Sequence, residues 1–490
     1  LDLYKSLFIF KIDNQMSKAK FEVITHLKLF EPTSFVVDGD LISNTCPKTK
    51  EKYKYQIQQN DDFHLDHYNH FPMILNSDGS LWEQANLFLL DSLKSVKRVS
   101  PKTLESKSVD LVMFKRWLDT EEVDYLSVPK RIMARPTYRF CAYLHELIRN
   151  GEIKSSTAKR RMGTVQTFYR WLKTCAGVTF DYPLWREKEV FINFKDHKGF
   201  SLSKKQISTD LSFKQTNNNS DYEEYIQDGG KLRPLATTEQ YQLVEALRNI
   251  GNSEMTLSFM FALTTGARLQ TVFTLRHCHF EAEIPDTLKV VKINTGNGTL
   301  IDTKYGKNIV LHIPAWLYRR IQLYLGSKRA KTRNQLSRLV YESENYQYAF
   351  LTKGGRPYYM ANSDPFLTLY RHPPRGISVN AFIRQQLIPE LTSKGHIFSI
   401  RFHDLRATFG MNLLEDKIKS TNHNSTMGRE LLSGDALWSA LMIVQKRLGH
   451  SSITTTERYL TYRKDFSIAL TVQSEFEKHL MQVSDDYEGN

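Results

Sequence analysis

The spacing of hydrophobic positions predicts a run of helices in the first third of the chain. Ser100 is suited to an N-cap and Pro101 to a first helical residue, and an apolar face with helical period follows them. A second helix is expected from about Thr137 to Arg149, and a third starts near Ser156. Residues 97–175 therefore look like a small all-helical domain.

A polar stretch separates this domain from the rest of the chain. Residues 176–231 have no sustained period, and the later half of Gln206–Gly230, rich in Ser, Asn, Asp and Gln, is typical of an interdomain linker. Periodicity returns with a helix start at Thr237. Alternating β-branched residues at Leu288–Ile293 and Ile309–Ile313 then predict a β hairpin.

The charge balance indicates a polyanionic partner. The 490 residues suggest two or three domains, and 67 Lys and Arg against 53 Asp and Glu give a net charge of +14. Nucleic acid is the first expectation and an anionic membrane surface the second. An ordinary basic enzyme with neither partner is the alternative.

Several classes of protein are excluded. The apolar stretch Leu7–Ile12 is too short to span a bilayer and lacks a signal-peptide pattern. The four cysteines are far apart and form no C-x-x-C pair, so a reducing cytosolic compartment fits better than a disulfide or zinc framework. The histidine-rich segment His64–His70 is expected to be a solvated loop rather than a metal site. The first Met is Met16, so residues 1–15 are an upstream extension or a cloning artefact.

Two cationic residues lie where they could face a concave site. Arg268 follows a Gly break between two apolar helices, and Lys304 lies between the two predicted strands. Taken alone, each has a simpler explanation, because an Arg in a helix junction is usually salt-bridged and a turn Lys is usually solvated.

Two further pairs lie nearer the end of the chain. His403 and Arg406 are three positions apart, which places an imidazole beside a guanidinium on one face of a helix, a pairing suited to a phosphate. His450 precedes Tyr459 by nine residues, across a short break and a helix start.

Together these segments resemble the tyrosine recombinase family, also called phage integrases. The family pattern is an Arg in a T-G-x-R turn, a hairpin Lys, an H-x-x-R pair, an L-G-H turn and a Tyr about nine residues beyond that His; the chain has all five in this order. The resemblance covers about residues 97–483. It implies a mainly α fold with a small β-sheet or hairpin: a helical core-DNA-binding domain followed by a mixed α/β catalytic domain.

The resemblance divides the chain into five parts. They are an N-terminal region of unknown role (1–80), a helical SAM-like core-DNA-binding domain (81–176), a linker (177–231), a tyrosine recombinase catalytic domain (232–463) and a C-terminal tail (464–490). The tail has an amphipathic face that is too short to form a stable helix alone. The resemblance implies that it docks on a neighbouring subunit of a tetramer, and packing on its own domain is the alternative.

The resemblance also implies a role for each residue of the set in breaking a DNA phosphodiester. Arg268 and Arg406 would neutralise the phosphate oxygens, and His450 would donate a hydrogen bond to the scissile phosphate. Tyr459 would form a 3′-phosphotyrosine, and His403 would take or hold the phenol proton. Lys304 would protonate the departing 5′ hydroxyl, with Lys307 as its rival. No metal, ATP or other cofactor is required.

The chain departs from the family pattern in two places. Many relatives have an acidic residue three positions after the first Arg, where this chain has Thr271, so Arg268 must be supported differently. Arg406 and His450 are 44 residues apart (450 − 406), and the segment 416–435 looks inserted.

The third helix of the helical domain has Lys159, Arg160 and Arg161 in its first turns, where cations oppose the helix dipole. These residues are candidates for contacts with DNA phosphates, and an ordinary solvated face is the alternative.

The leading hypothesis is a site-specific DNA recombinase, an integrase of a mobile element. Its expected partners are double-stranded DNA, three further copies of the chain, and accessory DNA-bending or directionality proteins, with no membrane. The expected location is the cytoplasm of a prokaryote, at the nucleoid. A type IB topoisomerase, a telomere resolvase and a non-catalytic architectural DNA-binding protein remain alternatives.

Overall fold

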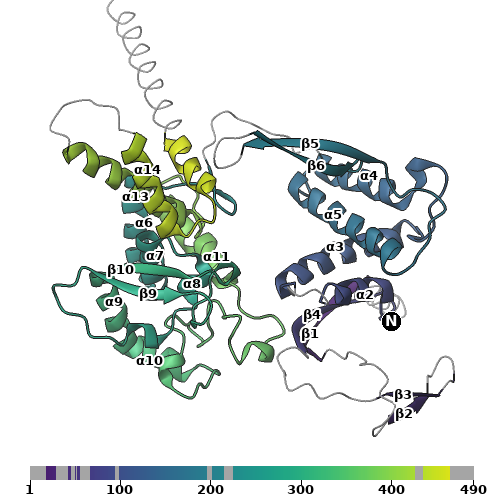
Figure 1. The fold of residues 1–490 in the computed structure, drawn as a ribbon. Coiled ribbons are helices and arrows are strands. Elements are labelled where there is room, and N and C mark those ends of the chain that lie inside the picture. Colours follow the sequence, from purple (N-terminus) through teal and green to yellow (C-terminus); the bar gives the residue numbers. More distant parts are fainter. Residues whose placement is uncertain are drawn as a thin grey trace, which may run out of the picture. The chain divides into compact units, whose positions relative to one another are not determined.

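The computed structural model describes residues 18–28, 42–45, 50, 52–55, 67–93, 99–195, 201–213, 225–424 and 434–463. The chain forms two compact units. Unit 1 comprises residues 1–216 and 368–371, and unit 2 comprises residues 217–367 and 372–490. Figure 1 shows the helices and strands of each unit.

The three helices predicted for the first unit are present as α3 (Pro101–Thr120), α4 (Pro136–Arg149) and α5 (Ser155–Thr174). The structure adds α2 (Glu83–Asp91) before them and the short helix η1 (Ile132–Ala134) between α3 and α4. The expected cap of α3 is also present, because the Ser100 side chain accepts a hydrogen bond from the Thr103 backbone N–H and Pro101 is the first helical residue. Aromatic side chains fill the space between the helices: the ring centroids of Phe114 and Phe140 are 4.8 Å apart.

The structure corrects the domain boundary predicted at residue 80. Strand β1 (Lys20–Lys28) pairs antiparallel with β4 (His67–Leu75), and β2 (Ile42–Thr45) pairs with β3 (Lys52–Tyr55). Side chains of β4, including Phe71 and Ile74, are buried in the same hydrophobic cluster as the helices. One core therefore extends across residue 80, because strand and helices bury their apolar faces against each other.

The predicted linker 177–231 contains regular structure. Strand β5 (Glu187–Lys195) pairs antiparallel with β6 (Ser201–Thr209), and Leu184 and Phe213 on either side of the hairpin are buried in the core of unit 1. The strands are rich in charged residues, so main-chain pairing forms this hairpin where the sequence has no clear alternation. The unit boundary follows residue 216, inside the polar stretch, and the asparagine run 217–219 lies outside the described residues.

Unit 2 is mainly helical, with a short hairpin of β7 and β8 before its first helix and the predicted hairpin of β9 and β10 in its middle. Its strands are β7 (Ile226–Gln227), β8 (Lys231–Leu232), β9 (Val290–Thr295) and β10 (Ile309–Pro314). Its helices are α6 (Thr237–Ile250), α7 (Ser253–Thr265), α8 (Leu269–Phe273), η2 (His277–Phe280), η3 (Lys304–Gly306), α9 (Ala315–Gly326), α10 (Lys328–Gln335), η4 (Glu344–Tyr346), α11 (Ile377–Phe382), the π-helical turn η6 (Ile383–Leu387), α12 (Ile388–Ser393), α13 (Asp404–Asn424) and α14 (Gly434–Leu448). The short helix η5 (Leu367–Leu369) has its first residue in unit 2 and the other two in unit 1. Residues 453–463 form a final helical segment.

The fold class agrees with the sequence prediction: helices dominate, and every sheet among the described residues is an antiparallel pair of strands. The segment 416–435, expected to be an insertion, begins as a continuation of α13 to Asn424, and residues 425–433 lie outside the described part. The tail 464–490 also lies outside it, so its docking on another subunit stays a prediction. In the described ranges, no helix is long and apolar enough to cross a membrane, and no three His, Cys, Asp or Glu side chains are grouped to hold a metal ion.

Candidate active site

The turn between α7 and α8 positions Arg268. The helix α7 ends at Gly266, which has φ +69°, and a Cβ at this position would lie 2.6 Å from Phe409 and 2.7 Å from Leu448. Only glycine fits both the left-handed backbone and the close packing. Arg268 then precedes the first residue of α8, with its side chain largely buried.

Arg406 joins this turn to two other helices. Its NH1 donates a hydrogen bond to the Gly266 carbonyl oxygen (2.9 Å) and its NH2 donates one to the Leu448 carbonyl oxygen (2.7 Å). The guanidinium on α13 therefore satisfies backbone acceptors at the ends of α7 and α14, which fixes its orientation. Its Nε remains to bind an anion.

The final helical segment places Tyr459 in the same site. The side chain of Tyr459 is fully buried, and a Cβ at Gly410 of α13 would overlap its ring. His450 lies beside it, with 5.8 Å between the two ring centroids, and the Nδ1 of His450 is 2.9 Å from the Thr456 hydroxyl. The H-x-x-R pair, the L-G-H turn and the tyrosine are thus brought together by the packing of α13 and α14.

A residue that the sequence analysis did not select lies at the centre of the site. Asp228 is at the tip of the β7–β8 hairpin and is 3% exposed. Its Oδ2 accepts hydrogen bonds from Arg406 Nε (2.8 Å), His450 Nε2 (3.0 Å) and the Tyr459 hydroxyl (3.2 Å). Its Oδ1 is 3.6 Å from Arg268 NH2. One carboxylate therefore links four of the six predicted residues.

The carboxylate and the two guanidinium groups control the charge of the site. Burial raises the pKa of Asp228, but the hydrogen bonds and charges of His450 and Arg406 outweigh it and hold that pKa far below its ordinary range. Burial and the Asp228 carboxylate raise the pKa of Tyr459 well above the value of a free phenol. The phenol is therefore protonated at neutral pH and donates to the carboxylate.

Both histidines are neutral at pH 7. Burial and the neighbouring cations Arg406 and Arg268 lower the pKa of His403 to about 4, and a hydrogen bond to the Asp228 backbone opposes this shift. Burial also lowers the pKa of His450, against the opposing effect of Asp228. Because a carboxylate only accepts hydrogen bonds, the neutral His450 ring has its hydrogen on Nε2.

The β9–β10 hairpin brings Lys304 to the edge of the same group. A Cβ added at Gly229, the residue after Asp228, would lie 3.2 Å from Lys304 Nζ. The rival Lys307 donates instead to the Gly449 carbonyl oxygen (2.9 Å) and lies 3.4 Å from the Ser451 hydroxyl. Lys304 thus lies against the turn that fills the site, whereas Lys307 is bonded to the loop that precedes the last helix.

The missing acidic residue after Arg268 has a structural replacement. Thr271 uses its hydroxyl to donate to the Asp302 carbonyl oxygen (2.8 Å), and it makes no described contact with Arg268. Asp228 supplies the negative charge next to Arg268 instead. Burial and the charge of Arg406 still lower the pKa of Arg268 to about 10, which leaves it cationic at neutral pH.

The basic residues of α5 lie in unit 1 and differ from one another. Lys159 is exposed. Arg160 forms an ion pair with the buried Asp110 of α3, at 2.7 Å, and also bonds the Ser106 hydroxyl. In Arg161 the Nε and NH1 atoms are buried without a hydrogen-bond partner among the described residues. The sequence made all three residues candidates for contacts with DNA phosphates, and in the structure Arg160 also joins α5 to α3.

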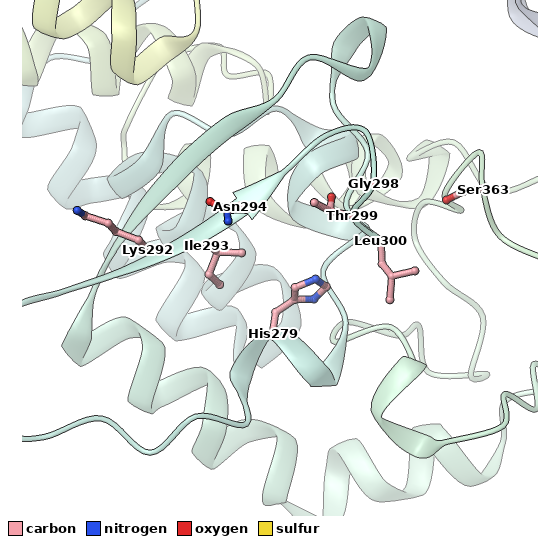
Figure 2. A pocket seen from close by; sticks show the side chains of 8 residues that line it. All are labelled: His279, Lys292, Ile293, Asn294, Gly298, Thr299, Leu300 and Ser363. Atoms are coloured by element: carbon pink, nitrogen blue, oxygen red, sulfur yellow. The ribbon is translucent and has the colours of Figure 1, made fainter.

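Two hollows of unit 2 lie apart from each other and have different lining residues. An open pocket of about 660 Å³ lies along β9 and is lined by His279, Lys292, Ile293, Asn294, Gly298, Thr299, Leu300 and Ser363, none of them a predicted catalytic residue (Figure 2). The hollow lined by Arg268 and Arg406 measures about 20 Å³, room for roughly one water molecule. The side chains of Arg406, His450 and Tyr459 are themselves buried, so this part of the predicted site is closed to solvent.

A partial signal for Asp228 exists in the sequence. Asp-Gly-Gly between short segments is typical of a hairpin turn, and both glycines have positive φ, +70° at Gly229 and +158° at Gly230. The pattern predicts the turn, but it says nothing of which side chains lie around the aspartate.

Comparisons with known proteins give one family and several structures. The model of the phage integrase N-terminal SAM-like domain matches residues 87–174. No curated protein sequence matches the chain. Among solved structures, the Tn1549 transposon integrase in complex with transposon right end DNA has a TM-score of 0.39 and 14% identity, over 76% of this chain and 93% of that chain.

Two lambda integrase structures are similar to a comparable extent. A dimer bound to a COC′ core site has a TM-score of 0.39 and 15% identity, over 77% of this chain and 94% of that one. A tetramer bound to a Holliday junction has a TM-score of 0.34 and 12% identity, over 85% and 91%.

The family match coincides with the helices α2 to α5, the domain that the sequence analysis expected to be SAM-like. Residues 87–174 of this chain match the model of the phage integrase N-terminal SAM-like domain family, in agreement with the resemblance that the motifs indicated.

Proposed function

We propose that this protein is a site-specific DNA recombinase, an integrase of a mobile element, that cuts and rejoins DNA through a 3′-phosphotyrosine intermediate and a Holliday junction. The observation that supports this most strongly is the arrangement of Arg268, Arg406, His450 and Tyr459 around one buried anion. A phosphodiester has the same single negative charge as that carboxylate and accepts hydrogen bonds from the same donors. The SAM-like domain supports the same class of protein.

The first step needs charge neutralisation. Attack of the Tyr459 oxygen on phosphorus adds negative charge to the non-bridging oxygens, and Arg268 and Arg406 would stabilise it. Arg406 is suited to this because NH1 and NH2 already bind backbone oxygens. The guanidinium is therefore oriented before the reaction, and no free energy is needed to orient it during the reaction. His450 would hold one phosphate oxygen through its Nε2 hydrogen.

Two proton transfers accompany the exchange of bonds. The bond from Tyr459 to phosphorus forms as the bond from phosphorus to the 5′ oxygen breaks. The phenol loses its proton to His403, whose ring is neutral at pH 7 and can accept it. The departing 5′ oxygen takes a proton from Lys304. The phosphotyrosine keeps the energy of the broken bond, so a 5′ hydroxyl can reverse the step without metal or ATP.

Strand exchange requires two DNA duplexes, and we propose that four copies of the chain hold them. The tail 464–490 would dock on a neighbouring copy, and Lys159 with the neighbouring basic residues of α5 would contact DNA phosphates. Accessory DNA-bending or directionality proteins are further proposed partners. The expected place of action is the prokaryotic nucleoid.

A covalent-capture experiment tests the proposal without knowledge of the target sequence. The full-length chain is mixed with a library of nicked duplexes that have randomised cores, in which cleavage releases a short 5′-hydroxyl fragment and traps the adduct. Protein–DNA adducts that survive denaturation are isolated and sequenced. We expect adducts on a restricted set of sequences, formed in the presence of a metal chelator.

The alternatives give different results in the same assay. DNA binding with no adduct on any sequence would identify an architectural DNA-binding protein. Relaxation of supercoiled DNA with no strand exchange between captured sites would identify a type IB topoisomerase. Closed hairpin ends made from a captured site would identify a telomere resolvase.

A further inference from the structure

The turn of the β7–β8 hairpin fills the site that the proposed function assigns to DNA. Asp228, Gly229 and Gly230 form this turn, and the Asp228 backbone N–H donates to the Gly230 carbonyl oxygen at 3.1 Å. The side chain of Asp228 points at Arg268, Arg406, His450 and Tyr459, and its backbone bonds His403. The turn therefore contacts five of the six residues, and Gly229 lies close to the sixth, Lys304.

The contacts of Asp228 are those that a phosphate would need. Its two oxygens lie between the two guanidinium groups, and one of them accepts three hydrogen bonds at once. Three donors on one oxygen, two of them from Arg406 and His450, form a strong anion site. The NH1 and NH2 groups of Arg406 each already donate to a backbone oxygen, and its Nε donates to Asp228. A DNA phosphate that binds Arg406 through Nε would therefore have to displace the carboxylate.

The hairpin is held at its base and not only at its tip. Ile226 and Leu232 are buried in the cluster that contains Tyr459. Arg458 donates to the Gln227 carbonyl oxygen at 2.8 Å, and Arg401 bonds the Lys231 carbonyl oxygen. The base thus anchors the turn over the site, and the two glycines after Asp228 give the tip the backbone freedom to move.

We propose that Asp228 is an internal substitute for the scissile phosphate, which keeps the active site closed until DNA displaces it. The inference rests on the proposed function for the identity of the competing anion. The closed state neutralises Arg268 and Arg406, holds Tyr459 protonated and excludes solvent phosphate. DNA must compete with a carboxylate that is part of the same chain, so stray cleavage at weakly bound sequences is suppressed.

The first test uses an anion in place of DNA. Asp228→Asn removes the charge and keeps the shape, and Asp286→Asn removes the same charge from an exposed surface position as a matched control. Inorganic phosphate is titrated at constant ionic strength while the melting temperature of the full-length protein is measured. We expect phosphate to raise the melting temperature of Asp228→Asn by about 2–4 °C at roughly fivefold excess over its Kd, with almost no effect on the wild type or on Asp286→Asn.

The second test measures cleavage on a captured nicked duplex at a DNA concentration below saturation. If the closed state is populated about tenfold more than the open state, Asp228→Asn should form adduct about tenfold faster than the wild type. This difference in rate should vanish at saturating DNA. Asp228→Ala should behave in the same way, which guards against an effect peculiar to the amide.

The outcomes separate this inference from the proposed function. Equal phosphate responses in all variants, or a loss of cleavage in Asp228→Asn with DNA binding unchanged, would overturn the inference, and the second result would make Asp228 a positioning residue for Tyr459. A phosphate response confined to the Asp228 variants, with no adduct from any variant on any DNA, would support the closed anion site and contradict the recombinase. The phosphate response can be read even if Asp228→Asn is less stable, because bound phosphate restores the missing charge.

Discussion

The hydroxyl of Tyr459 donates a hydrogen bond to the carboxylate of Asp228, 3.2 Å away, although the two residues are 231 positions apart in the chain. Both side chains are buried, and burial together with the contact raises the pKa of the phenol. The phenol held in this way is protonated and directed at an anion. Under the proposed function, this arrangement would keep Tyr459 inactive beside the two guanidinium groups until DNA enters the site.

The assignment of Tyr459 as the nucleophile is testable against its neighbour Tyr462. Tyr459→Phe should bind DNA as the wild type does and form no adduct, because the attacking oxygen is absent. Tyr462→Phe should retain adduct formation, since this residue lies one helical turn further along. Adducts are counted on denaturing gels with the captured duplex. Loss of the adduct in Tyr462→Phe alone would transfer the role to that residue.

The position of Lys304 predicts a specific rescue. Lys304→Ala should lower the cleavage rate about 10²–10⁴-fold, the usual contribution of a general acid. A duplex with a 5′-bridging sulfur should restore the rate, because a thiolate leaves without protonation. Lys307→Ala is the matched control: Lys307 bonds Gly449 and Ser451, so its loss should not respond to sulfur. Rescue confined to Lys307→Ala would reverse the two roles.

The contact between Gly410 and Tyr459 predicts a large effect of one methyl group. In Gly410→Ala the new Cβ would overlap the tyrosine ring and lie 3.0 Å from Leu448, so unfolding free energy should fall by about 1–3 kcal/mol and cleavage should fail. Gly163→Ala in α5 is the control, because nothing lies within 4 Å of its Cβ. That change should stabilise the helix by about 0.5–1 kcal/mol. Urea unfolding midpoints measure both, and equal effects would contradict the close approach.

The depressed pKa of His403 predicts how stability depends on pH. Its pKa is about 4 when folded, against 6.5 for an ordinary histidine. Between these values the unfolded chain binds a proton that the folded chain does not, so stability falls as the pH falls from about 6.5 to about 4. This group alone should account for about 2–3 kcal/mol of the loss at the lower end. His403→Asn should flatten the curve of urea midpoint against pH.

A second histidine separates stability from activity. His279 is half-buried, with a pKa lowered to about 4 by desolvation, and it lies outside the site. His279→Asn should flatten the same curve and leave adduct formation unchanged. A His403→Asn curve as steep as that of the wild type would show that His403 is charged in the folded protein.

The basic residues of α5 should contribute unequally to DNA affinity. Each neutralised phosphate adds about −0.9 to the slope of log K against log salt, so Lys159→Ala should reduce the magnitude of the slope by about one. Arg160→Ala should mainly lower the stability of unit 1, because it leaves the buried Asp110 unpaired. DNA affinity is measured over a range of salt concentrations, with urea unfolding in parallel. A wild-type slope near zero would contradict phosphate contacts altogether.

The parts of the protein that depend on neighbours in the chain could be predicted from its amino-acid sequence. Ser100 and Pro101 start α3 as predicted, because a cap and a fixed φ act within one helical turn. The β9–β10 hairpin and the turn at Gly266 follow from local alternation and from a left-handed glycine. The motif residues could also be chosen from sequence, because their spacing resembles a known family.

The surroundings of those residues depend on how elements that are far apart in the chain pack together. The sheet of β1 and β4 shares a core with the helices because both bury apolar side chains in it. The charged strands β5 and β6 pair within the predicted linker through main-chain hydrogen bonds, which need no common local pattern of side chains. Asp228 is the clearest case. Its turn is predictable from Asp-Gly-Gly, but its partners Arg406, His450 and Tyr459 are 178, 222 and 231 positions away. Only the packing of α13 and α14 against the hairpin brings these donors to one carboxylate. Contacts over such separations depend on how whole helices and strands bury their surfaces against each other, and not on the spacing of residues within a single helix or strand.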